Sequence, residues 1–332
     1  MNLPAAWHSI LWTAKRPAFR RAIYGAALTA LGLLGILFQA HLSWFYAIQF
    51  LFWSYLIILI GAALALVSIV APKVRAAMVG AGFVFFLAFI LPFGRDLIEN
   101  VHFGHSPPQT HLRVIAFNWM ADNPHVLQIY PWLKAQSADI VAIEEFTPGA
   151  QGVETQLYPQ FPFRTSGGGD ILILSKYPIQ KEMDVPAEEH TAVITEIGVN
   201  GHTVQVVAVH APTLRNIQEL AMRNAYLSKL AYFLPWWKDS RLVIGDFNAT
   251  RWDPYFARAE KNARAHEQPA LFPWVTRMGV RSGLSFLGSP IDHILIDRKG
   301  SLSKCHTGPA FGSDHAPIIC EATFFGKAPK PH

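Results

Sequence analysis

The first third of the chain contains three long apolar stretches without a single charged residue. They span about residues 22–40, 44–71 and 76–94. Each is at least as long as the roughly 17–20 residues that a helix needs to cross a bilayer, so the pattern predicts three transmembrane helices. A cleaved signal peptide is the alternative for the first stretch only, because two more stretches follow it without a small-residue cleavage pattern.

Basic residues flank these stretches in an alternating way. Four Lys or Arg residues precede the first stretch, the 41–43 connection has none, and Lys73 and Arg75 separate the second stretch from the third. Because Lys and Arg in short loops stay on the cytoplasmic side, we expect a cytoplasmic amino terminus and an extracytoplasmic location for everything after Arg95. The second stretch is longer than one span requires, and two short helices there would reverse this topology.

From residue 112 onward, short apolar runs alternate with helical patterns. The pattern predicts strands at 112–117 and 139–144 on either side of a helix at 124–137. Pro131 is expected to kink or split that helix, because proline cannot donate the backbone hydrogen bond of a helix interior.

A hairpin and further elements follow. Apolar runs at 191–199 and 202–209 flank Asn200-Gly201, the strongest short signal for a two-residue hairpin turn. The remaining pattern predicts one helix and then four strands, at 215–234, 241–245, 291–296, 303–307 and 316–324. Hairpins mixed with helices favour a two-sheet α/β sandwich over a doubly wound parallel sheet.

These patterns divide the chain into four parts. We expect a membrane anchor at 1–100, a linker at 101–111 marked by a Pro-Pro pair, a folded catalytic domain at 112–325 and a tail at 326–332. A mean hydropathy of +0.22 with only 15% charged residues agrees with a chain that is partly embedded in a membrane.

The net charge of +5 does not indicate a nucleic-acid partner once the charges are located along the chain. Seven basic and two acidic residues precede residue 100, which leaves 21 basic and 21 acidic residues for the rest. The basic excess therefore reflects membrane topology and is no evidence for a polyanionic ligand.

Cys305 and Cys320 are the only cysteines of the chain. Two cysteines exclude a zinc cluster built from thiolates. We expect two buried free thiols, with a single disulfide as the alternative if the domain lies outside the cytoplasm.

Six segments place polar side chains at the ends of predicted strands. In the Gly-Asp-Phe-Asn segment at 245–248, alternate side chains share a face, so Asp246 and Asn248 are expected to point into one pocket while Phe247 packs behind them. The other five segments are Asn118, Glu144-Glu145, His210, Asp292-His293 and Ser313-Asp314-His315. Six such segments in one domain indicate a shared pocket at the rim of the sandwich.

The residue types in these segments suit the hydrolysis of phosphate esters. A hard divalent cation such as Mg²⁺, or Mn²⁺ in its place, takes oxygen ligands, usually one or two carboxylates together with water and substrate oxygens. Carboxylate and histidine side chains supply proton transfer and charge stabilisation. Clustered sulfur and histidine ligands are absent from the sequence pattern, which disfavours zinc.

Seven sequence pieces carry a resemblance to a known family. They are VIAFN (114–118), DIVAIEEF (139–146), ILILSKYPI (171–179), VVAVH (206–210), VIGDFNA (243–249), IDHILI (291–296) and GSDHAPI (312–318). In this order the chain resembles the endonuclease/exonuclease/phosphatase superfamily over about residues 111–325. The resemblance implies a DNase I-like fold, a two-layer β-sandwich flanked by helices in the order α/β/β/α. The three-span unit is similar to that of bacterial membrane-anchored members, which implies a multi-pass protein of the bacterial inner membrane.

For a metal site, the resemblance implies Glu145 as the main Mg²⁺ ligand, Asn118 as its companion and Asp314 as support for the metal region. Two positions depart from the family pattern. Glu144 stands where many members have Gln, and a structural hydrogen-bonding role is favoured for it over metal binding. Met120 stands where some nucleases of this fold carry an acidic residue, which argues against a second metal of that type.

For catalysis, the resemblance implies that Asp246 orients or deprotonates the attacking water and that Asn248 holds water and phosphate. His315 would stabilise the developing negative charge or protonate the leaving group, with Asp292 orienting its imidazole ring. His210 would contact the phosphate. In-line attack needs groups on both sides of the phosphorus atom, so residues from different strands are required.

The resulting hypothesis is a membrane-anchored, Mg²⁺-dependent phosphodiester hydrolase, most simply of nuclease type. A nuclease needs a groove rich in Lys and Arg, which must be local here because the domain is net neutral. A phospholipid or sphingolipid headgroup phosphodiesterase or phosphatase is the alternative, since the predicted spans bring the domain to a membrane. A non-catalytic receptor domain is expected to lose an Asp or His of the motifs, and none is lost. No protein partner is predicted.

Overall fold

The structure is a computed structural model, and it describes residues 108–147, 152–166, 169–187, 190–234, 240–251, 253–268, 275–277 and 289–325. The three predicted membrane spans, most of the linker and nearly all of the tail lie outside these ranges. None of the helices inside them combines the length and the hydrophobicity that crossing a membrane requires.

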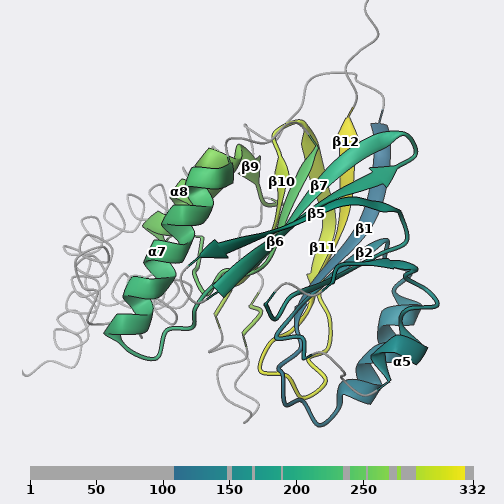
Figure 1. Ribbon diagram of the computed structural model, residues 1–332, viewed down its shortest axis with the longest axis horizontal. Coiled ribbons are helices and arrows are strands. Elements are labelled where there is room, and N and C mark those ends of the chain that lie inside the picture. Colours follow the sequence, from purple (N-terminus) through teal and green to yellow (C-terminus); the bar gives the residue numbers. More distant parts are fainter. Residues whose placement is uncertain are drawn as a thin grey trace, which may run out of the picture. The chain divides into compact units, whose positions relative to one another are not determined.

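Twelve strands of the described residues form two sheets of six strands each (Figure 1). The first sheet has the spatial order β11 (Gly300–Thr307), β12 (Ile318–Phe325), β1 (Pro108–Asn118), β2 (Ile140–Glu144), β4 (Leu172–Ser175) and β3 (Phe163–Arg164). The second has the order β5 (Ile179–Ala187), β6 (His190–Val199), β7 (His202–His210), β8 (Arg241–Asp246), β10 (Asp292–Asp297) and β9 (Ala265–His266). In each sheet one neighbouring pair is parallel, β1 with β2 and β7 with β8, and the other pairs are antiparallel.

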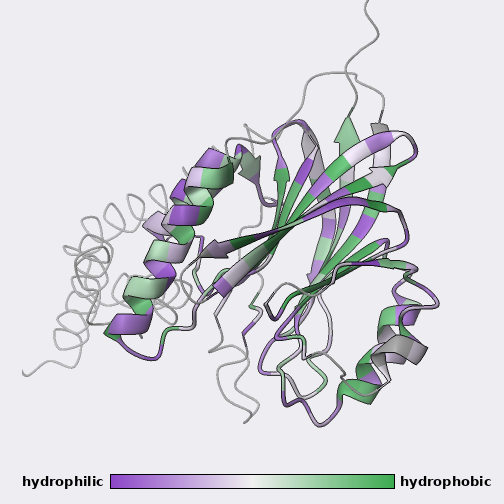
Figure 2. Cartoon of the chain, viewed as in Figure 1, coloured by the Kyte–Doolittle hydropathy of each residue, from purple (hydrophilic) through white to green (hydrophobic). Residues whose placement is uncertain are grey.

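The central strands are apolar along their whole length because both of their faces are buried. In β1, Leu112, Val114 and Ala116 pack into the core between the sheets, whereas Ile115 and Phe117 pack into a second core on the outer face. A third core covers the outer face of the other sheet. Figure 2 shows the strands mostly hydrophobic and helix α7 banded, as expected for one buried and one solvated helix face.

Helices cover both outer faces, which gives the predicted α/β/β/α order of layers. The four described helices are α5 (Val126–Ala135), α6 (Val153–Gln156), α7 (Ile217–Phe233) and α8 (Pro254–Ala263). α5 packs on the β1–β2 side, and α7 and α8 lie together on the β7–β8 side (Figure 1). The sequence-based prediction of a two-layer sandwich flanked by helices is confirmed for the described residues.

Local sequence signals set the helix ends. α7 begins after Asn216, whose side chain accepts from the backbone N–H of Glu219, while the Glu219 carboxylate accepts from the N–H of Arg215. α8 begins after Asp253 with a proline in its first turn, and it ends at Arg264, whose φ of 51° is left-handed.

Pro131 does not split its helix, contrary to part of the prediction. α5 runs as one helix from Val126 to Ala135 with Pro131 inside it. The hydrogen bond that proline cannot donate would go to the carbonyl of Leu127. Leu127 is 52% exposed, so water can replace the missing donor and the helix continues.

The prediction of two free thiols is wrong, because Cys305 and Cys320 form a disulfide. They lie on the neighbouring strands β11 and β12, with their Cα atoms 4.2 Å apart. The pairing register shifts between Ser303 and His306, and this irregularity places Cys305 beside Cys320. Neither the shift nor the strand pairing is visible in two cysteines 15 positions apart.

A buried ion pair between α7 and the start of α8 leads to a stability prediction. Arg223 Nη1 lies 2.7 Å from Asp253 Oδ2, and both side chains are buried. We expect Asp253→Ala to lower the free energy of unfolding by about 3–5 kcal/mol, because it strips a buried guanidinium of its carboxylate and removes the cap of α8. Asp253→Asn keeps the capping oxygen and should cost less. Urea unfolding followed by tryptophan fluorescence measures both. The exposed Asp122→Ala is the control, and an equal loss in Asp253→Ala and Asp122→Ala would contradict the assignment.

Candidate active site

Strand ends from both sheets meet at one rim of the sandwich. In the first sheet Asn118 is the parallel partner of Glu144, and in the second His210 is the parallel partner of Asp246. Asp292 faces Asp246 across the antiparallel pair of β8 and β10. Asn118 Nδ2 lies 3.3 Å from Asp246 Oδ2, so a hydrogen bond joins the two sheets at this rim.

An open cleft of about 760 Å³ lies above these strand ends. Six of the eight predicted site residues line it, namely Glu145, His210, Asp246, Asn248, Asp314 and His315. The other two, Asn118 and Asp292, are buried and form hydrogen bonds to residues that line the cleft. The fold therefore brings all eight predicted residues to one place.

Glu145 directly follows β2, has a left-handed backbone conformation and lines the cleft. Its φ is 55°, and its carbonyl accepts from Trp119 Nε1 at 2.9 Å, which fixes this conformation. Oε1 accepts from Asn118 Nδ2 at 3.0 Å and Oε2 accepts from the N–H of Ala121 at 3.1 Å. Each carboxylate oxygen has further lone pairs, so the group can accept these bonds and still bind a ligand.

Asp246 and Asn248 share one pocket, as predicted. Asp246 Oδ1 accepts from the N–H of Asn248 at 2.7 Å, and Oδ2 lies 3.2 Å from Asn248 Nδ2. Asn248 Nδ2 also donates to the carbonyl of Ala211 at 2.8 Å. Within the described part of the chain its Oδ1 is buried without a partner. Phe247 packs behind the pair in the outer core.

His315 lies between two carboxylates. Its Nδ1 donates to Asp292 Oδ2 at 2.9 Å, and its Nε2 is 3.7 Å from Asp246 Oδ2. Burial alone would lower the pKa of this histidine, but the charges of Asp292 and Asp246 outweigh burial and raise the pKa to about 9. His315 is therefore an imidazolium at neutral pH.

A second histidine–aspartate pair stands at the cleft, and the sequence motifs revealed only half of it. His210 Nδ1 lies 2.6 Å from Asp170 Oδ2, and the His190 ring stands edge-on to the His210 ring at 5.6 Å. Burial opposes the charged form of His210, but the hydrogen bond with Asp170 raises its pKa. Asp170 directly precedes the apolar run of β4, so the rule that found the other strand-end residues would have found it too.

Glu144 is a buried acid beneath the cleft. Its hydrogen-bonding role was predicted wrongly, since neither carboxyl oxygen has a partner among the described residues. Burial, and then the charges of Asp292 and Asp246, raise its pKa well above the ordinary value, which favours the protonated form. Gly245 makes room for it, because a Cβ at its φ of 126° would lie 2.2 Å from the carbonyl oxygen of Val209 and 2.7 Å from Glu144 Oε1.

The cluster whose potential ligand atoms converge most closely among the described residues is not the predicted metal set. Asp246, Asp292 and His315 offer ligand atoms within 4.8 Å of one another. These three groups can hold a metal ion, or, with His315 charged, they can carry out proton transfer. Asp314 lines the same cleft outside this cluster, with Oδ2 3.6 Å from Arg277 Nη2.

The oxygens of Glu145 and Asn248 suit a hard divalent cation, whereas Asn118 Oδ1 is buried and accepts from the N–H of Met120 at 3.1 Å. Glu145 supplies a carboxylate at the cleft, and the unpartnered Asn248 Oδ1 is an amide oxygen in need of a donor or a cation. No thiolate takes part, because both cysteines are in the disulfide. This donor chemistry is that of Mg²⁺ or Mn²⁺ and not of zinc.

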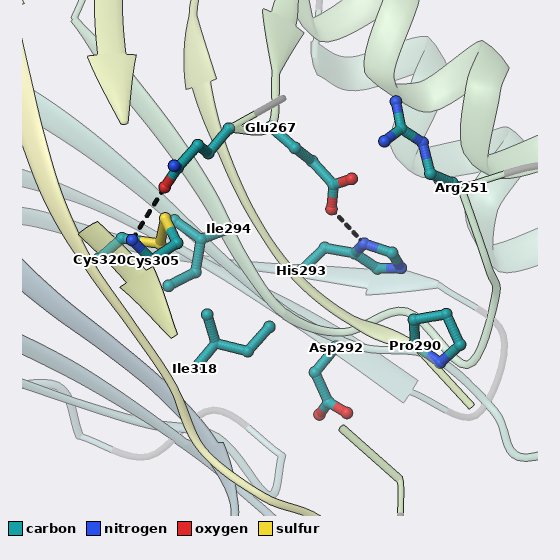
Figure 3. Close-up of a pocket in the computed structure, with 10 residues that line it drawn as sticks. Arg251, Glu267, Pro290, Asp292, His293, Ile294, Cys305, Ile318 and Cys320 are labelled. Atoms are coloured by element: carbon teal, nitrogen blue, oxygen red, sulfur yellow. Dashed lines mark hydrogen bonds and ion pairs between the residues drawn. A yellow bond between two sulfur atoms is a disulfide. The ribbon is translucent and has the colours of Figure 1, made fainter. Parts of the chain in front are cut away.

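His293 is a buried part of the wall behind the site. Nδ1 contacts Glu267 (Figure 3). Nε2 lies 2.7 Å from the carbonyl of Ala249, and the ring packs on Phe256. A cavity of about 30 Å³ separates this histidine from the disulfide (Figure 3). A space of that size holds about one water molecule.

The fold and the site together indicate a class of enzyme. An α/β/β/α sandwich with a carboxylate–amide pocket and two histidine–aspartate pairs at one rim suits a phosphoester hydrolase. The chain belongs to the Endonuclease/Exonuclease/phosphatase family, whose model matches residues 100–315. Family membership and the shared fold point to phosphoester hydrolysis.

Solved structures share this fold at low sequence identity. Sphingomyelinase C from Streptomyces griseocarneus is 16% identical, with coverage of 64% of this chain and 99% of that one and a TM-score of 0.51. Humanized D. rerio TDP2 is 15% identical, with coverage of 64% and 99% and a TM-score of 0.54. An endonuclease/exonuclease/phosphatase from Beutenbergia cavernae is 16% identical, with coverage of 66% and 72% and a TM-score of 0.52. No curated protein is significantly similar in sequence.

The His293–Glu267 pair gives a prediction for the pH dependence of stability. Burial opposes the charged form of His293, but Glu267 raises its pKa above the ordinary 6.5. The stabilisation that the charged His293 provides is therefore fully present below about pH 6.5, and it is lost as the pH rises through the folded-state pKa of His293. We expect His293→Phe to be less stable than the wild type by about 3–5 kcal/mol at pH 6, because Glu267 loses its buried partner. The difference should shrink by pH 9.

Urea unfolding of both proteins at pH 6 and pH 9 measures this difference. Comparing the two proteins at each pH cancels the contributions of His210 and His315, which are common to both. A gap of constant size across this range would show that the pair is not ionised.

Proposed function

We propose that the chain is a membrane-anchored, divalent-metal-dependent phosphodiester hydrolase of nuclease type, with its catalytic domain at 112–325 outside the cytoplasm. The observation that carries the catalytic part is the position of Asp246. Its carboxylate contacts Asn118, which also binds Glu145, and lies near His315, which binds Asp292. The three uncharged stretches before residue 95 support the anchor, and the Lys and Arg pattern supports the orientation.

Glu145 and Asn118 would hold the cation, and the fit of the Glu145 carboxylate to Mg²⁺ supports this role. A bound Mg²⁺ would neutralise charge on a phosphate oxygen and orient the phosphate for attack. Asp314 would support the metal region from its position on the cleft wall. His210, charged through its bond to Asp170, would contact the phosphate from the side of β7.

Asp246 would take a proton from the attacking water. Burial and the nearby charge of Asp292 raise its pKa, which makes it a stronger base than an exposed aspartate. Asn248 would help to place the same water, because its buried Oδ1 can accept the second water hydrogen. Water polarised from one side in this way can attack the phosphorus atom in line with the leaving oxygen.

His315 would place positive charge beside the phosphoryl oxygens as their negative charge grows. Its Nε2–H points toward the neighbourhood of Asp246, and its Nδ1–H is held by Asp292. A buried, charge-assisted donor of this kind stabilises a developing oxyanion more strongly than a solvated one.

The nuclease assignment is supported by the openness of the cleft and by the arginines along it. Arg215 and Arg277 both line the cleft, although the domain as a whole carries no net charge. An open cleft with positive side chains suits an extended phosphodiester strand. Hydrolysis of a lipid headgroup is the competing function, because the predicted spans bring the domain to a bilayer.

The catalytic proposal predicts the effects of metal removal and of one substitution. Full-length protein purified in detergent should hydrolyse a phosphodiester with Mg²⁺ and lose this activity with a chelator. Asp246→Asn keeps the shape but not the base, so kcat should fall by about 10²–10⁴-fold. Arg258→Ala, on an exposed face of α8, is the matched control and should retain activity. Undiminished turnover by Asp246→Asn would remove Asp246 from the mechanism.

The substrate is tested in the same preparation with single-stranded DNA, supercoiled DNA, RNA and phospholipid vesicles. We expect release of nucleotide products and little release of headgroups. Cleavage of the lipid alone would replace the nuclease assignment by the lipid alternative while leaving the catalytic residues as proposed.

The orientation proposal predicts the behaviour of reporter fusions. Alkaline phosphatase fused after the last residue should be active, because this enzyme requires an extracytoplasmic location, and a cytoplasm-dependent fluorescent protein at the same point should be dark. Fluorescence from that fusion would contradict an odd number of membrane spans before the catalytic domain.

A further inference from the structure

Arg277 is fixed beside the catalytic histidine by its backbone. Its N–H donates to the carbonyl of Ser289 and its carbonyl accepts from the Ser289 N–H, both at 2.9 Å. On its other side Arg277 is bridged to His315 in antiparallel fashion. Opposed residues of such pairs have Cα atoms about 4.5–5.5 Å apart, so the position of Arg277 relative to His315 is set by backbone pairing.

The neighbouring Thr276 strengthens this attachment. Its carbonyl accepts from the N–H of Ala316, directly after His315, and its hydroxyl accepts from the N–H of Asp292 at 3.1 Å. The segment that carries Arg277 is thus bonded to the residues that flank His315 and to its partner Asp292. An arginine held so close to both members of a catalytic pair is well placed to contact the substrate.

The guanidinium of Arg277 lies at the mouth of the cleft and not on its floor. Its side chain is 34% exposed and lines the cleft, whereas the side chains of Asp246 and His315 are almost completely buried. The cleaved phosphate would bind on the floor, where Asp246 and His315 act. Arg277 is therefore positioned for a group attached farther along the substrate.

The ion pair between Arg277 and Asp314 is loose. The distance from Nη2 to Oδ2 is 3.6 Å, longer than a charge-assisted hydrogen bond of about 2.7–2.9 Å. Partly exposed pairs of this kind contribute little to stability. A phosphate, whose geometry suits the fork of a guanidinium, can compete with Asp314 for it.

Arg215 and Arg277 line the same cleft as the catalytic aspartate. Arg215 follows β7, and Arg277 pairs with Ser289 just before β10 and with His315 just before β12, while β8 with Asp246 runs between β7 and β10. A substrate that extends along the cleft from Asp246 can meet both guanidinium groups. Two phosphates of one strand offer a ligand for each of them, and a single isolated phosphoester does not.

We infer that Arg277 is a specificity-determining residue that binds the phosphate next to the one being cleaved, so that the enzyme acts on a strand with consecutive phosphates. This inference rests on the proposed function, because it assumes that the cleaved phosphate binds over Asp246. It adds the substrate feature that is recognised and the residue that recognises it.

The direct test is binding without catalysis. The full-length chain in detergent, with chelator present, is titrated with thymidylyl-thymidine and with its 5′-phosphorylated and 3′-phosphorylated forms, and Kd is measured by calorimetry. We expect one phosphorylated form to bind about 10- to 100-fold more tightly than the unphosphorylated dinucleotide. Arg277→Ala should abolish this preference. Arg277→Lys should retain part of it, since the charge remains and the fork is lost.

Arg258→Ala is the matched control and should keep the whole preference. A wild type that binds all three dinucleotides equally would overturn the inference. So would Arg277→Ala with an intact preference, or an equal loss of affinity for all three dinucleotides, which would indicate damage to the site as a whole.

Hydrolysis of the same dinucleotides with Mg²⁺ separates this inference from the proposed function. We expect Arg277→Ala to raise KM for the preferred dinucleotide about 10-fold or more, with a much smaller change in kcat. Hydrolysis without any preference would overturn only the role of Arg277. A preference in binding without hydrolysis of any dinucleotide would instead count against the nuclease function while retaining Arg277 as a phosphate-binding residue.

Discussion

Burying several carboxyl groups at the junction of two sheets is the physical constraint on which the site depends. Glu144, Asp246 and Asp292 are all buried, and burial together with the charge of Asp292 raises the pKa values of Glu144 and Asp246. Isolated buried carboxylates would be far too costly. Two features reduce this cost, since burial shifts Glu144 toward its protonated form and His315, with a pKa raised to about 9, lies between the other two. The same arrangement leaves a base and a charged donor next to each other at the floor of the cleft.

The sheet topology explains why these groups meet. Each sheet has one parallel pair, and both pairs end at the same rim, with Asn118 beside Glu144 and His210 beside Asp246. Carboxyl ends of parallel strands are where ligands bind in α/β folds. The hydrogen bond from Asn118 to Asp246 then joins the two sheets at the point where the chemistry would occur. A shift of either strand by one residue would turn these side chains into the apolar cores.

The sequence predicts the parts of the fold and site that depend on local pattern. Central strands and the polar residues at their ends could be located because apolar runs and their terminations are visible in one dimension. Strands β3, β4, β5 and β9 and helices α6 and α8 were not predicted. Pro131 was misjudged because the exposure of Leu127 is a tertiary property. Arg277 had no signal at all, because only pairing across 12 and 38 positions, to Ser289 and His315, brings it to the cleft.

Local charge, not net charge, decides what this cleft can bind. The basic excess of the chain lies before residue 100 and the remainder is neutral, so a ligand class inferred from the total would be misplaced. Charges in solution act over roughly 8–10 Å at physiological salt, about the width of two strand spacings. At that range the cleft presents the carboxylate of Glu145, which suits a cation, and two arginines, Arg215 and Arg277. A metal and a polyanion can therefore be attracted to adjacent parts of one neutral domain.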